Sequence, residues 1–127
     1  VMVQVPREQF EHYVTQAIAN VPEPYKSQLQ NVAFFVENEP SPEQRTQLGL
    51  RPCQSLFGLY QGVPLPARGG NSGNLLPDSI TIFVVAHEQA ANSLAELQHQ
   101  INNTVWHEVA HYFGLDHKRI HELQRPT

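Results

Sequence analysis

Three histidines and a glutamate lie within eleven positions near the end of the chain, at His107, Glu108, His111 and His117. On an α-helix, positions 107 and 111 are about 40° and about 6 Å apart, so both imidazoles can reach one metal ion. Glu108 follows about 100° further round, beside that ion, where a base acting on a metal-bound water belongs. By chance, the spacing H-E-x-x-H-x-x-G-x-x-H would occur in only about one in ten thousand sequences of this length and composition. The motif therefore predicts a metal site.

His117 can join this site only if the helix ends before it, because on a continued helix it would point to another face. Gly114 is suited to end the helix, since glycine adopts the left-handed C′ conformation without a Cβ penalty. The motif thus predicts a helix, a stop, a reversal and a third ligand. Asp116 competes with His117 for that role. The spacing favours His117 and leaves Asp116 as a helix cap or a partner that orients a ligand.

The long motif is similar to that of the metzincin branch of the zincin metallopeptidases. Metzincins carry a methionine turn after the third ligand, whereas the single methionine here is Met2. A closer resemblance is to the minimal zincin family of small bacterial zinc-dependent proteases with a matrix-metalloprotease-like domain. In that family the last motif position is often aspartate, so His117 is a variant of the pattern. The stretches that carry the resemblance are LFGLYQGVPL (56–65), LPDSITIF (76–83) and HEVAHYFGLDH (107–117).

The resemblance implies a minimal zincin-like α+β fold and one zinc ion per chain, held by His107, His111 and His117. The order of elements predicts the same class, a small mixed β-sheet packed on helices, with the motif on a long helix. At 127 residues the chain is expected to form one zincin-like metallopeptidase domain over 1–127. The predicted helices are 7–21, 91–113 and 117–125, with a short helical turn at 25–30 and a helix or turn at 41–49. The predicted strands are 31–40, 55–63 and 79–86, with Gly58 a candidate for a bulge and a loop at 64–78.

Two functions fit the motif. The first is a zinc metallopeptidase, in which zinc lowers the pKa of its water from 15.7 toward about 7 and polarises the scissile carbonyl. Glu108 would take the proton of that water and deliver it to the leaving amine. The alternative is a non-catalytic zinc-binding or protein-interaction domain with a zincin fold. Structural zinc sites normally have four protein ligands, usually cysteines, so three histidines and a glutamate favour catalysis.

Several other side chains have two interpretations. Cys53 is either an inhibitory thiolate that reaches the metal or an ordinary loop thiol, and the second is favoured because no partner motif accompanies it. His121 is either a group that supports the site or a surface residue. Tyr60 is a weak candidate for an oxyanion donor. The remaining histidines (His12, His87, His99) are expected in surface or capping roles, and the aromatic residues around the motif (Trp106, Tyr112, Phe113) in the core or a pocket wall.

Net charge and hydropathy narrow the expected partners. A net charge of −4 argues against nucleic acid and anionic membranes. No apolar run approaches the length of a membrane span, and the first ten residues do not combine a charged leader with an apolar stretch, so a cytoplasmic location is expected. The expected partner is a peptide or protein substrate, and the oligomeric state is left open. We expect the substrate to add to 79–86 as an edge strand, an interpretation favoured only slightly over a buried central strand.

Overall fold

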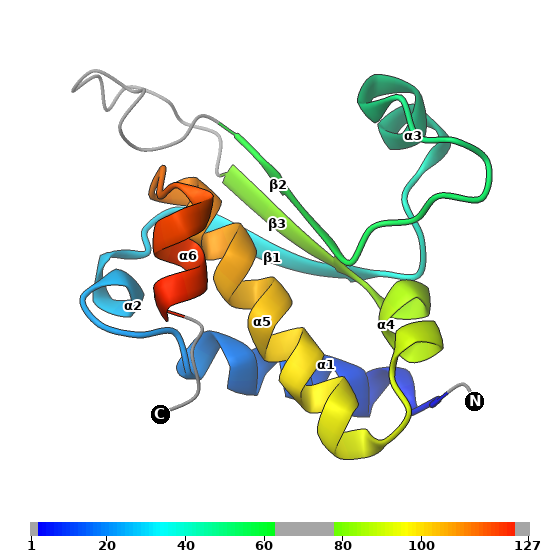
Figure 1. The fold of residues 1–127 in the computed structure, drawn as a ribbon, viewed down its shortest axis with the longest axis horizontal. Coiled ribbons are helices and arrows are strands. Elements are labelled where there is room, and N and C mark those ends of the chain that lie inside the picture. Colours follow the sequence, from blue (N-terminus) through cyan, green and yellow to red (C-terminus); the bar gives the residue numbers. More distant parts are fainter. Residues whose placement is uncertain (1–2, 63–77, 124–127) are drawn as a thin grey trace.

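A computed structural model describes residues 3–62 and 78–123, apart from the side chains of His117, His121 and Leu123. The predicted loop at 64–78 therefore lies outside the described residues except for its last position. Figure 1 shows a small sheet with a long helix running beneath it. The elements are α1 (Arg7–Ala19), α2 (Tyr25–Gln28), β1 (Val32–Glu37), α3 (Pro42–Leu48), β2 (Gly58–Gln61), β3 (Asp78–Phe83), α4 (Val84–Ala90), α5 (Leu94–Tyr112) and α6 (His117–Leu123).

The described residues form a mixed sheet of three strands in the order β1–β3–β2. β1 runs parallel to β3, and β2 runs antiparallel to it. The expectation that 79–86 forms an edge strand is therefore wrong. β3 is the central strand, and Ile80, Ile82 and Phe83 are fully buried, which explains its continuous apolar sequence.

Residues 84–86 also differ from their prediction, since they begin helix α4 and do not extend the strand. Val84 and Val85 are β-branched residues that favour a strand in isolation. Here the chain leaves the sheet at Phe83, the N-cap of α4, and the amide of Val85 donates to the carbonyl of Asn38, just beyond the end of β1. Tertiary contacts thus override local propensity.

The long helix α5 is the element that carries the motif. It begins after Ser93, whose hydroxyl accepts a hydrogen bond from the amide of Glu96 at 3.1 Å and so satisfies a free donor of the first turn. One side of α5 is buried against α1, β2 and β3. The fully buried residues on that side are Leu97, Ile101, Val105 and Val109, at the helical spacing that the sequence predicts.

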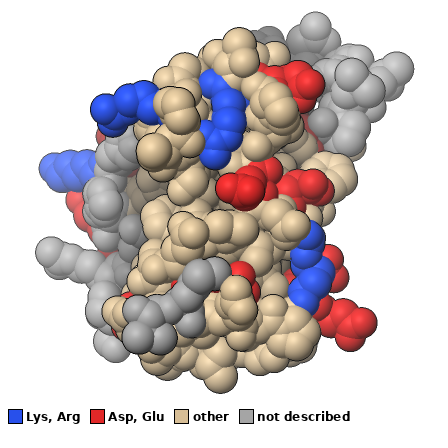
Figure 2. All heavy atoms as spheres, turned by 90° about the vertical axis from the view of Figure 1, so that its right-hand side faces the viewer, with Lys and Arg blue, Asp and Glu red and all other residues tan. Residues whose placement is uncertain are grey.

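The surface that includes α3 and α4 is largely uncharged. Figure 2 shows this face, in which a few basic and acidic side chains, some of them side by side, lie among other residues. Over the described residues, the structure contains no helix with the length and apolar character needed to cross a bilayer.

Candidate metal centre

His107, Glu108 and His111 form one group in the C-terminal half of α5. Each offers a ligand atom, and these atoms lie within 4.8 Å of one another. The two imidazole rings have centroids 4.6 Å apart and are inclined at 80°. Both rings are half-buried, whereas Glu108 is only 8% exposed. The helix therefore brings the two histidines together at a partly open surface, as their spacing predicts.

Two imidazoles and a carboxylate suit zinc, which takes nitrogen and oxygen ligands. The set lacks the four protein donors of a closed structural site among the described residues. His117 is the first residue of α6, but its side chain lies outside the described residues, as does that of His121. The residues that are described thus fit a metal site with positions left over for a third ligand and a water or substrate.

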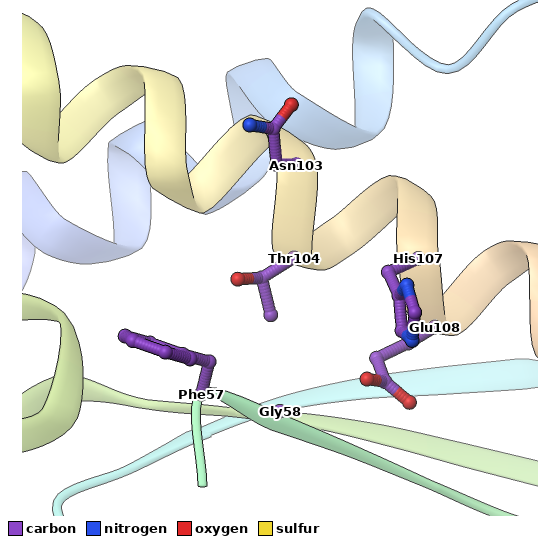
Figure 3. A pocket seen from close by; sticks show the side chains of 6 residues that line it. All are labelled: Phe57, Gly58, Asn103, Thr104, His107 and Glu108. Atoms are coloured by element: carbon purple, nitrogen blue, oxygen red, sulfur yellow. The ribbon is translucent and has the colours of Figure 1, made fainter. Parts of the chain in front are cut away.

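Glu108 points from α5 toward strand β2, as Figure 3 shows. Its carboxylate accepts a hydrogen bond from the backbone amide of Tyr60, which favours the charged form. Burial disfavours that form more strongly and raises the pKa of Glu108 to about 7. A carboxyl group with this pKa can both accept and release a proton near neutral pH.

Gly58 lets helix and strand approach closely at this point. A Cβ atom at position 58 would lie 2.7 Å from the Thr104 methyl carbon and 3.2 Å from Cγ of Glu108. The glycine begins β2, so its role is this close approach and not the bulge that the sequence suggested. It sets the distance between Glu108 and the strand.

Two hollows meet at Gly58 and Glu108. The first has a volume of about 330 Å³ and extends toward the N-terminal half of α5; the second has a volume of about 450 Å³ and extends past His111. Together they form a cleft that passes the metal-binding group on both sides. The first is lined by Phe57, Gly58, Asn103, Thr104, His107 and Glu108 (Figure 3); the second by Leu48, Leu50, Leu56, Gly58, Leu59, Tyr60, Glu108 and His111.

The end of α5 follows the predicted stop. Gly114 has φ 73°, and the amide of Leu115 donates to the carbonyl of Ala110 at 3.0 Å, which closes the last turn. Asp116 is exposed, and its Oδ1 accepts a hydrogen bond from the Arg119 amide at 2.8 Å. It therefore caps α6, one of the two roles left open for it, and it does not belong to the metal-binding group of described residues.

His87 departs from its prediction, because it is fully buried and not on the surface. Nδ1 lies 2.8 Å from the carbonyl oxygen of Phe83 and Nε2 lies 2.8 Å from the hydroxyl of Thr104. A carbonyl can only accept, so Nδ1 carries the proton and Nε2 accepts from Thr104. Desolvation lowers the pKa of His87, which keeps the ring neutral. A single histidine after an apolar run gives no sequence signal for this burial.

The other singled-out side chains lie mostly as expected. The Tyr60 hydroxyl donates a hydrogen bond to the carboxylate of Asp78 at 2.6 Å. The backbone amide of Tyr60 donates to the carboxylate of Glu108. Cys53 is exposed and lines a different hollow, and its sulfur is not among the atoms of the metal-binding group. His12 and His99 are exposed, as predicted. Trp106 and Tyr112 are buried and Phe113 half-buried, as expected for core or wall residues.

Comparison with known proteins assigns most of the chain to a family. Residues 29–126 match the family model described as zincin-like metallopeptidase. A solved structure of a conserved hypothetical protein from T. thermophilus is similar in fold, with a TM-score of 0.57 and 23% sequence identity, over 86% of this chain and 94% of that one. No curated protein matches the chain.

Proposed function

Because the chain belongs to the zincin-like metallopeptidase family, we propose that it is a zinc-dependent peptidase. The observation that carries the proposal is the position of the metal-binding group in a cleft beside the edge strand β2, with the buried Glu108 between helix and strand. The ion would be held by His107, His111 and His117. Zinc at such a site would act as a Lewis acid, which lowers the pKa of a bound water toward about 7 and polarises a carbonyl group.

Glu108 is the proposed general base and acid. Its carboxylate lies beside the two histidine ligand atoms, where it would take a proton from the attacking water and then release it to the leaving amine. The Tyr60 amide fixes the carboxylate against β2. Gly58 leaves room for this arrangement, because a Cβ atom there would lie 3.2 Å from Cγ of Glu108. These contacts hold the proton carrier in place before substrate arrives.

The edge of β2 is the proposed docking strand for a peptide. The amide of Phe83 donates to the carbonyl of Phe57. Because hydrogen-bonded residues alternate along an antiparallel pair, Leu59 and Gln61 are the residues of β2 that hydrogen-bond to β3. The alternate residues Gly58 and Tyr60 direct their backbone groups away from β3, toward the cleft. An extended peptide placed there would add a strand to the sheet and bring its main chain past Glu108.

Digestion of a peptide library tests the proposal directly. We expect the zinc-loaded protein to cleave peptides and a chelator to abolish cleavage. Glu108→Gln should keep its zinc and lose activity by about 10²–10⁴-fold, because the amide cannot accept a proton. Zinc binding without cleavage by the wild-type protein would instead support the non-catalytic zinc-binding domain. Full activity of the variant would remove Glu108 from the mechanism.

A further inference from the structure

Four leucines gather in the hollow beside His111. Leu48 ends α3, Leu50 and Leu56 belong to the segment between α3 and β2, and Leu59 lies in β2. Leu48 is 46% exposed and the others are half-buried. None of the four belongs to the hydrophobic core or packs against it. We call these residues (Leu48, Leu50, Leu56, Leu59) the leucine wall.

The leucine wall is held in place by hydrogen bonds, since α3 contributes no buried residue. Ser41 and Gln44 form a reciprocal capping box at the start of α3, and Gly49 ends it with φ 66°. The Arg45 guanidinium donates to the carbonyl of Gln54 at 2.8 Å. Figure 1 shows α3 standing clear of α1 and α5. This unit is therefore built as a separate, fixed support at one side of the cleft.

The same hollow is continuous with the metal centre. Glu108 and His111 line it together with the leucine wall, and among the described residues they are its only ionisable side chains apart from Tyr60. Its volume of about 450 Å³ lies in the range of small-molecule sites. Exposed leucines cost free energy in water, and covering them returns about 25 cal/mol per Å² of apolar surface. An occupant of this hollow would thus be apolar where it meets the leucines.

We propose that the leucine wall is a specificity pocket for a large aliphatic or aromatic side chain of the substrate, next to the scissile bond. This inference rests on the proposed peptidase function, because the occupant belongs to a peptide lying on the edge of β2. An acidic side chain would place its charge against the four leucines, with no lysine or arginine in the described lining of the hollow. The pocket therefore selects apolar side chains and rejects acidic ones.

The test compares Leu48→Gln and Leu48→Lys with the wild-type chain. Leu48 is half exposed, so neither change should disturb the fold. Leu94→Gln is the matched control, because Leu94 is 49% exposed at the start of α5 and does not line the hollow. In library digestion, the wild-type protein and Leu94→Gln should prefer Leu or Phe over Ala and Asp at one position flanking the cleaved bond. Leu48→Gln should reduce this preference in kcat/KM by about tenfold or more, and Leu48→Lys should raise cleavage of Asp-containing peptides.

A binding measurement separates this inference from the peptidase function. Fluorescein-labelled peptides that differ only by Leu or Asp at one position are titrated into zinc-loaded Glu108→Gln protein, which should bind without cleaving. Tighter binding of the Leu peptide that is lost in the Leu48→Lys,Glu108→Gln double variant would support the pocket even if the wild-type protein cleaved nothing. Equal binding of both peptides, or a Leu preference unchanged by both Leu48 variants, would overturn it.

Discussion

Two histidine environments lie against the same helix and differ in every respect that matters for function. His107 and His111 are half-buried, face each other across 4.6 Å and line the cleft. His87 reaches α5 from α4, is fully buried and has both ring nitrogens within 2.8 Å of protein oxygens. Phe57 packs edge-on against its ring at 4.9 Å. The first pair is arranged to bind, and the second ring is arranged to stay neutral and hold its surroundings together.

The difference teaches that burial and partners decide the role of a histidine. Thr104 shows how close the two environments are, because its hydroxyl bonds to His87 while the residue also lines the cleft with His107. His87 thus supports the wall of the site from behind. Four sets of variants test the contrast between the binding pair and the buried ring.

The largest effect is expected when His107 or His111 is replaced. His107→Ala or His111→Ala should each abolish stoichiometric zinc binding, because the loss of one of two helix-borne imidazoles breaks the ligand set. Elemental analysis of the purified proteins measures this, and circular dichroism checks that each variant is folded. Stoichiometric zinc in either variant would show that the metal site lies elsewhere. His117→Ala beside Asp116→Ala then identifies the third ligand, and we expect only the first of these to weaken binding.

Glu108 is buried, as His87 is, and it lies beside His107 and His111. The folded protein keeps a proton on Glu108 up to about pH 7, whereas the unfolded chain releases it near 4.5. Between these values the native state binds more protons, so the free energy of unfolding falls as pH rises through this window. In metal-free protein, Glu108→Gln should abolish this fall in the free energy of unfolding and stabilise the fold at pH 8 by up to about 3 kcal/mol relative to the wild-type protein. Urea unfolding at pH 4.5 and pH 8 measures it; an equal effect at both values would contradict the raised pKa.

His87→Gln should destabilise the protein by about 1–3 kcal/mol near pH 7.5 while it keeps its zinc, since a buried hydrogen-bonded ring is lost. The pKa of His87 is lowered in the fold. As pH falls below about 6.5, the unfolded chain takes up a proton there that the native chain does not, and stability decreases. His87→Gln lacks this pH dependence. The difference in free energy of unfolding between the variant and the wild-type protein should therefore become smaller toward pH 5. Loss of zinc would mean that His87 belongs to the binding group.

The smallest effect is expected at His99, which is exposed on α5 and lies 3.2 Å from the amide nitrogen of Asn103. His99→Ala should change the free energy of unfolding by no more than about 0.5 kcal/mol and leave zinc binding intact. Thermal unfolding and metal analysis serve as the readouts. This variant is the control for removing any histidine from α5.

The sequence predicts those features that depend on local spacing. The 107–111 pair, the stop at Gly114 and the apolar side of α5 are set by helical geometry, and the structure confirms them. Features that depend on distant segments were not predictable in this way. Whether β3 lies at an edge depends on where β2 pairs, and the need for glycine at position 58 depends on Thr104, far along the chain. The burial of His87 depends on Phe57 and Thr104 in the same way.

Among the described residues no strand pairs with the outer edge of β2, which bears on how the protein behaves when it is concentrated. Unpaired strand edges are templates for joining one sheet to another, and proteins limit this by keeping such edges short. β2 has four residues, of which Gly58 and Tyr60 direct backbone groups outward, and the Tyr60 amide is already given to Glu108. A second copy pairing here would gain few hydrogen bonds. The short strand therefore limits pairing between copies, and a peptide that docks here would need side-chain contacts in the cleft in addition to these few hydrogen bonds.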